Sequence, residues 1–115
     1  MVDKKQLEAK LSKLMDDISE IEGLIALDLK GTVLVGQTIV EMDKALMAKT
    51  ALDVFTKAKA IGKSTGKGGV QAINISMDKG SACIVGNESL IVMSMQGTDA
   101  ANSIALIMRS LKACL

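Results

Sequence analysis

A long stretch at residues 40–61 contains no proline or glycine, and it constrains the fold more than any other feature. At about 100° per residue, its apolar residues gather on one helical stripe with a shoulder beside it. The stripe contains Met47, Ala51, Val54, Phe55, Ala58 and Ile61, and the shoulder contains Ala48 and Leu52. A helix of about 20 residues is roughly 30 Å long, and five strands at about 4.8 Å spacing span roughly 24 Å. The helix is therefore long enough to carry the chain from one edge of a small sheet to the other.

Shorter apolar segments flank this helix on both sides. The sequence predicts an amphipathic helix over residues 3–20, which Gly23 ends, and a last helix that begins at Thr98. Short apolar runs bounded by glycine, asparagine and aspartate turns predict strands between these helices. The strands are expected at residues 24–29, 32–36, 70–77, 81–86 and 89–95.

The resulting element order is α-β-β-α-β-β-β-α, which describes a hairpin, a crossover helix and a three-strand meander. Hairpins and meanders are antiparallel. If the two units join through their first and last strands, they form a five-stranded antiparallel sheet of order 2-1-5-4-3. The terminal helices then cover one face and the long helix covers the other. The expected fold is a single α+β domain of three layers that spans residues 1–115.

Composition argues against several classes of protein. The formal net charge is +1 and Phe55 is the only aromatic residue, whereas a nucleic-acid-binding surface is usually basic with stacking aromatics. Two cysteines are too few for a disulfide framework, so we expect a cytoplasmic, reducing environment. No apolar run reaches the roughly 20 residues that a membrane span needs.

Groups for catalysis are scarce in this chain. It has no histidine, the usual general base near neutral pH. Cys83, within a predicted strand, and Cys114, beside the apolar face of the last helix, are expected to be small core side chains. The Gly62-Lys63-Ser64 segment lacks the earlier glycine and the strand-loop-helix context of a phosphate-binding loop. With no metal-ligand cluster either, the sequence predicts a protein that is not an enzyme and uses no cofactor or metal.

Two features indicate self-association. The segment 70–77 is an edge strand in the expected order, and it has neither proline nor charge to block pairing with another strand. The long helix ends beside the same edge, and its small residues would let a second helix approach closely. A two-fold axis there would pair both elements, whereas the alternative is a monomer with a broadly buried helix. The predicted dimer interface contains Ala48, Ala51, Leu52, Phe55, Val70, Ala72, Ile73, Asn74 and Ile75.

The first hairpin resembles that of the roadblock/dynein light chain family. The resemblance rests on the sequence IEGLIALDLKG at residues 21–31, on GSAC at residues 80–83 and on the element order, and it covers nearly all of the chain. It implies a profilin/roadblock-like fold. Family members form homodimers or heterodimers through the second helix and third strand. They bind small Ras-like GTPases as activators or scaffolds, or they attach to dynein.

The resemblance therefore implies a dimeric, non-enzymatic regulator or scaffold for a small Ras-like GTPase. We expect the partner to bind the outer face of the long helix, opposite its core stripe. This face contains Met42, Leu46, Lys49, Asp53 and Thr56. Some prokaryotic relatives regulate a motility GTPase without supplying a catalytic arginine. The only arginine here, Arg109, falls in the last predicted helix and gives no reason to expect an arginine finger.

Two other functions remain open at this point. One is a small-molecule sensor of profilin- or PAS-like shape, and the other is an adaptor for dynein or vesicle trafficking. A sensor needs a cavity with converging polar groups. Asn74 and Ser94 are the kind of strand residue that would supply them, but they are few.

Overall fold

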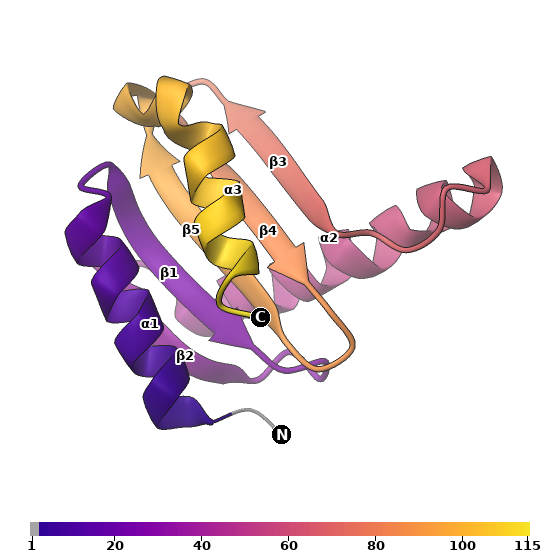
Figure 1. Ribbon diagram of the computed structural model, residues 1–115, viewed down its shortest axis with the longest axis horizontal. Coiled ribbons are helices and arrows are strands. Elements are labelled where there is room, and N and C mark those ends of the chain that lie inside the picture. Colours follow the sequence, from indigo (N-terminus) through magenta and orange to yellow (C-terminus); the bar gives the residue numbers. More distant parts are fainter. Residues whose placement is uncertain (1–2) are drawn as a thin grey trace.

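The computed structural model describes residues 3–115, except for the side chain of Ala101, and its elements follow the predicted order (Figure 1). They are α1 (Lys4–Asp17), β1 (Ile21–Leu27), β2 (Val33–Thr38), α2 (Lys44–Thr65), β3 (Ala72–Met77), β4 (Gly80–Gly86), β5 (Ile91–Gly97), the 3-10 helix η1 (Thr98–Ser103) and α3 (Ile104–Lys112). The strands form one antiparallel sheet in the order β2-β1-β5-β4-β3. The predicted fold class and strand order are confirmed.

Helices cover both faces of this sheet. α1 and α3 lie on one face, and α2 crosses the other (Figure 1). Leu24 and Ala26 belong to the core beneath the terminal helices, whereas Ile25 and Leu27 belong to the core beneath α2. Because successive strand residues point to opposite faces, a strand covered on both sides needs an almost continuous apolar run. This requirement explains why residues 24–27 of β1 are all apolar.

The long helix begins and ends later than predicted. It begins after Asp43, whose side chain accepts a hydrogen bond from the backbone N–H of Leu46 and so caps the first turn. It continues through Gly62 to Thr65 and ends where Gly66 adopts a left-handed conformation with φ of 71°. The prediction of a helix over 40–61, followed by a glycine loop from Gly62, is therefore wrong at both ends.

Gly23 and Thr98 have other roles than those predicted. α1 already ends at Asp17, and Gly23 lies within β1. A Cβ atom at position 23 would lie 2.8 Å from Met95 Cε and 2.9 Å from Thr38 Cγ2, so the glycine makes room for these side chains. Thr98 opens η1 and does not cap an α-helix, because α3 begins only at Ile104.

The turn between β1 and β2 is organised by Asp28. Its carboxylate oxygen accepts hydrogen bonds from the backbone N–H groups of Lys30, at 2.9 Å, and Thr32, at 3.0 Å. Gly31 follows with φ of 86°, a conformation that glycine adopts without strain. The hydrogen bonds from Thr32 and then Lys30 hold the pKa of the Asp28 carboxyl below its ordinary value. The turn predicted at residues 28–31 is thus confirmed.

Replacement of Asp28 with alanine is expected to lower stability at neutral pH, with a difference from wild type that shrinks in acid. A carboxyl whose pKa is lowered by folding stabilises the fold above its unfolded pKa, which is about 3.9. That contribution is lost as the pH falls through the lowered folded-state pKa. Urea unfolding of both proteins from about pH 7 to about pH 2.5 measures the effect. A difference that stays constant over this range would contradict a role for the charged carboxylate.

Candidate functional site

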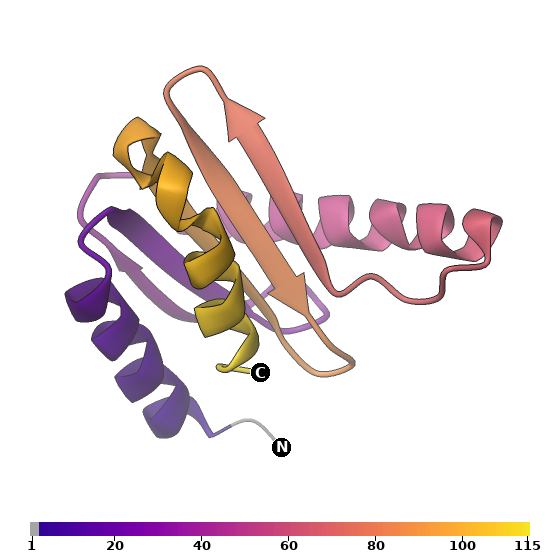
Figure 2. The same cartoon turned by 45° about the horizontal axis from the view of Figure 1, so that its top comes forward.

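One long edge of the sheet is open. β3 pairs with β4, and no second strand of residues 3–115 pairs with its other side (Figure 2). Ile73 and Ile75 are half-buried on the side of α2, and Asn74 is exposed on the opposite side. Val70 and Ala72, both half-buried, lie just before and at the start of the strand. All five residues predicted for the strand part of the dimer interface therefore lie at or beside this open edge.

The helix part of the predicted interface lies elsewhere. Ala48, Ala51 and Phe55 have exposed fractions of 0%, 1% and 2%, because the apolar stripe of α2 packs onto the sheet. Leu52 is half-buried and lies over the β1–β2 turn, where a Cβ at Gly31 would be 3.4 Å from its Cδ2. The three buried side chains have almost no free surface within one chain. A helix contact across a two-fold axis therefore needs other side chains of α2.

Such side chains lie on the α2 arm, which we define as residues 58–65. The C-terminal end of α2 extends past β3 and away from the sheet (Figure 2). Ala58 is half-buried there, and Ile61 is 68% exposed. The prediction that Ile61 belongs to the stripe facing the core is wrong, because helical periodicity does not reveal where the sheet beneath the helix ends. The α2 arm and the β3 edge thus place exposed Ile61 and half-buried Ile73 and Ile75 at one side of the sheet, with Lys59 and Lys63 exposed beside Ile61.

The outer face of α2 is a second, separate surface. Leu46 is 58% exposed, and Lys49, Asp53 and Thr56 are exposed beside it. Met42, predicted to be exposed, is half-buried and packs against the core beneath α2, because it precedes the helix. Four of the five residues predicted to bind a partner are thus accessible on one helix face.

The β1–β2 turn borders this outer face, although it was not among the residues predicted to bind a partner. A Cβ at Gly31 would lie 3.7 Å from Lys49 Cγ, so the turn touches α2 at the middle of the predicted face. Leu29 in the same turn is 42% exposed. The adjacency depends on how α2 crosses the sheet, which no local pattern in the sequence reveals.

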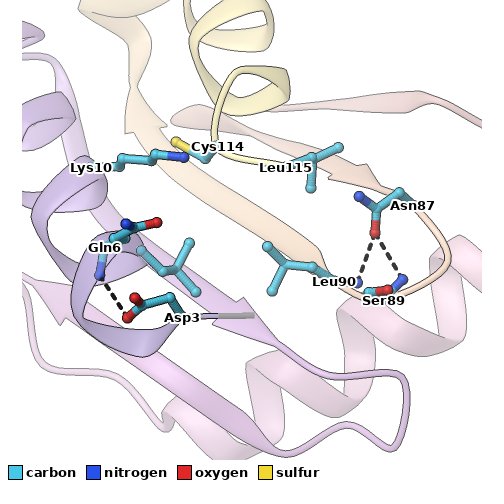
Figure 3. Close-up of a pocket in the computed structure, with 9 residues that line it drawn as sticks. Asp3, Gln6, Lys10, Asn87, Ser89, Leu90, Cys114 and Leu115 are labelled. Carbon is cyan, nitrogen blue, oxygen red and sulfur yellow. Dashed lines mark hydrogen bonds between the residues drawn. The ribbon is translucent and has the colours of Figure 1, made fainter. Parts of the chain in front are cut away.

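A cavity of about 240 Å³ lies between α1, the β4–β5 loop and the C-terminal residues (Figure 3). Two of its polar side chains, Asp3 and Asn87, are held by backbone N–H groups. Asp3 accepts hydrogen bonds from the N–H groups that begin α1, and Asn87 accepts from those of Ser89 and Leu90. Such caps stabilise local structure, so Asp3 and the amide oxygen of Asn87 serve the fold here.

Neither cysteine has the properties of an activated nucleophile. Burial raises the pKa of the Cys114 thiol, and the nearby charge of Lys10 opposes this shift (Figure 3). Burial also raises the pKa of the Cys83 thiol, against hydrogen bonds with Gln96 and Ser94. Because the thiolate is the reactive form, a raised pKa lowers reactivity at neutral pH. The prediction that both are small core side chains agrees with their burial.

Neither a metal-binding cluster nor a membrane-spanning helix occurs among residues 3–115. No cluster of three or more His, Cys, Asp or Glu residues among residues 3–115 has the arrangement of a metal site. Within the same residues, no helix combines the length and hydropathy needed to cross a membrane.

Comparisons with known proteins identify the fold. No family model matches the sequence, and no curated protein is significantly similar to it. Solved structures do match. MglB of Myxococcus xanthus is 11% identical, with a TM-score of 0.85 over 99% of this chain and 89% of that chain. A roadblock/LC7 domain from Streptomyces avermitilis is 15% identical, with a TM-score of 0.82 over 93% of this chain and 89% of that chain.

A third structure, described as MglB with a tetrameric arrangement, is 12% identical, with a TM-score of 0.81 over 97% of this chain and 92% of that chain. At such low identities the likeness concerns the fold alone. It agrees with the strand order, with the helices on both faces and with the resemblance seen in the first hairpin. The chain has the fold of a roadblock/LC7 domain.

Proposed function

We propose that this chain is a roadblock/LC7 family member that acts as a dimeric, non-enzymatic regulator or scaffold for a small Ras-like GTPase. The observation that carries the proposal is the position of the open β3 edge and the α2 arm at one side of the sheet. The fold and the resemblance of residues 21–31 support the class of partner, because family members bind such GTPases.

The dimer is proposed to form around a two-fold axis beside β3. An axis perpendicular to the sheet pairs β3 with its symmetry copy in antiparallel fashion and continues the sheet across both chains. The α2 arm of each chain then lies over the half-buried Ile73 and Ile75 of its partner, and Ile61 becomes covered. No charged residue within Ala72–Met77 opposes this pairing. A neighbour described as tetrameric MglB supports self-association of this fold.

The GTPase is proposed to bind across the outer faces of the two α2 helices. Leu46 supplies an exposed apolar centre, and Lys49 and Asp53 supply charges of opposite sign that set the orientation of a partner. Arg109 lies in α3, on the sheet face opposite α2, so it does not reach this platform. Regulation would therefore proceed through the position of the GTPase and not through an inserted arginine.

Replacement of Leu46 with aspartate is expected to weaken GTPase binding by about 30-fold or more, since a central apolar contact contributes roughly 2 kcal/mol. Leu46 is 58% exposed, so the dimer and its melting temperature should stay nearly unchanged. The measurement is calorimetric titration against small Ras-like GTPases of the source organism. Each GTPase is loaded with GDP or with a non-hydrolysable GTP analogue.

The matched control is Leu106→Asp, because Leu106 is 49% exposed but lies on α3, on the other face of the sheet. This variant should bind the GTPase like wild type. If Leu46→Asp and Lys49→Glu both keep wild-type affinity, the GTPase does not use the outer face of α2.

A further inference from the structure

A cavity of about 460 Å³ lies on the terminal-helix face of the sheet, beside β3. It exists because α3 packs on β4 and β5 and leaves the neighbouring β3 uncovered (Figure 2). Its walls therefore come from the edge strand on one side and from the start of the last helical segment on the other. They include Asn74, Ser76, Met77, Ser81, Thr98 and Ile104.

A chain of buried polar side chains ends at this cavity. The Ser94 hydroxyl, 0% exposed, donates a 2.8 Å hydrogen bond to Gln96 Oε1. Gln96, 2% exposed, donates from Nε2 to Ser81 Oγ at 2.7 Å and, more weakly, to Cys83 Sγ at 3.5 Å. The Cys83 thiol in turn lies 3.7 Å from Asn74 Oδ1, its acceptor on β3. These side chains share the terminal-helix face, which is otherwise apolar in the central strands.

Because of the direction of these hydrogen bonds, the Ser81 hydroxyl and the Asn74 amide can each donate a hydrogen bond into the cavity. A serine hydroxyl carries one proton and also accepts. The Ser81 oxygen accepts from Gln96, so its own proton needs another acceptor, and none is present among residues 3–115. Ser81 is only 9% exposed and lines the cavity. Asn74 accepts through Oδ1 and so keeps its amide protons, and Thr98 adds an exposed hydroxyl. A carbonyl oxygen in the cavity would accept from the Ser81 hydroxyl in place of water.

The wall chemistry restricts the class of ligand. No basic side chain lines the cavity, and the carboxylates of Glu22 and Asp99 lie beside its wall residue Gly97, so phosphate and carboxylate groups would find no counter-charge. Met77 and Ile104 offer apolar contact beside the donors, and the volume falls within the range of roughly 300–1,000 Å³ typical of ligand sites. We propose that this cavity binds a small, uncharged molecule. Its carbonyl oxygen accepts hydrogen bonds from Ser81 and Asn74, and its apolar part lies against Ile104.

All walls of the cavity come from one chain, so the proposal does not depend on the dimer or on the GTPase, although Asn74, Ser76 and Met77 belong to the strand at which the dimer is proposed to form. It lies on the sheet face opposite α2, where the GTPase platform is placed. Failure of the proposed function would leave it unaffected.

The test is NMR titration of the ¹⁵N-labelled protein with nicotinamide and with 2-pyrrolidone, two neutral carbonyl probes. Nicotinate is the charged counterpart of nicotinamide. Both neutral probes are expected to give saturable shifts at concentrations up to about 20 mM, a range suited to millimolar affinity. The shifts should be confined to backbone amides of residues 74–81 and 97–104. Nicotinate should give no saturable shift there.

Three variants complete the test. Ser81→Ala removes the buried donor and should weaken binding about fivefold. Ser76→Trp fills the cavity from an exposed position and should abolish binding without disturbing the buried network. Ser89→Ala, in the exposed β4–β5 loop, is the matched control and should bind like wild type. The proposal is overturned if neither neutral probe gives saturable shifts, if nicotinate binds equally well, or if the shifts survive Ser76→Trp.

Discussion

Replacement of Phe55 with alanine is expected to lower the free energy of unfolding by about 3–5 kcal/mol. Phe55 is 2% exposed and lies at the centre of the core beneath α2, together with Ile84 and Ile91. Its ring occupies space that Gly86 leaves open, since a Cβ there would lie 2.8 Å from the ring. It is the only aromatic side chain in the protein, so no other large ring can fill the space it vacates. Domains of this size are stable by roughly 5–15 kcal/mol, so the substitution would remove a large part of that stability.

Denaturant unfolding at a fixed protein concentration measures this change, because dimerisation would otherwise alter the apparent stability. Leu46→Ala is the control on the same helix. Leu46 is 58% exposed, and its truncation should change stability by less than about 0.5 kcal/mol. A loss below about 1 kcal/mol for Phe55→Ala would mean that α2 does not present this side chain to the sheet.

Replacement of Ile61 with glutamate is expected to weaken the proposed dimer roughly 1,000-fold. A symmetric interface contains each substitution twice, and burying an unpaired charge at a covered apolar position costs about 2 kcal/mol or more per copy. Ile61 is 68% exposed within one chain, so the variant should fold like wild type. Light scattering and sedimentation over micromolar concentrations measure the dissociation constant.

The control is Ile39→Glu. Ile39 is 70% exposed and follows β2, at the opposite edge of the sheet, so its replacement should leave the dimer intact. A wild-type protein that stays monomeric at high micromolar concentration contradicts the homodimer. If that protein associates only after a related roadblock domain is added, the partner is heterologous. An Ile61→Glu variant that dimerises like wild type places the interface elsewhere.

The topology could be predicted from the sequence because apolar residues are spaced differently in its helices and strands. The turns are also marked, by Asp28, Gly31 and Gly80. The residues at which helices end were harder to predict. Gly62 looks like a helix terminator, yet its carbonyl accepts hydrogen bonds from Lys67 and Gly68 after the helix has continued past it. Which of several glycines ends a helix depends on such contacts beyond the helix, and a local pattern does not contain them.

The positions of the two surfaces proposed for interaction could be predicted from the sequence to different degrees. The open edge follows from the strand order, so Ile73 and Asn74 were placed correctly beside it. The periodicity of α2 also identified the outward direction of Leu46. It did not show that the helix leaves the sheet before Ile61. The polar chain through Ser81 and Gln96 was missed because its members meet only across paired strands.

The two strands that meet at the centre of the sheet, β1 and β5, are the first and last in the chain. The β1–β2 hairpin and the β3–β5 meander each assemble from neighbours in sequence, but their junction closes a loop that includes all of α2. Such distant pairings are entropically costly and form late. During synthesis, the edge of β1 that pairs with β5 therefore stays unpaired until β5 has left the ribosome. Insertion of β5 between β1 and β4 is expected to limit the rate of folding, and a chain that stops before Ile91 would leave both of these strands with an open edge.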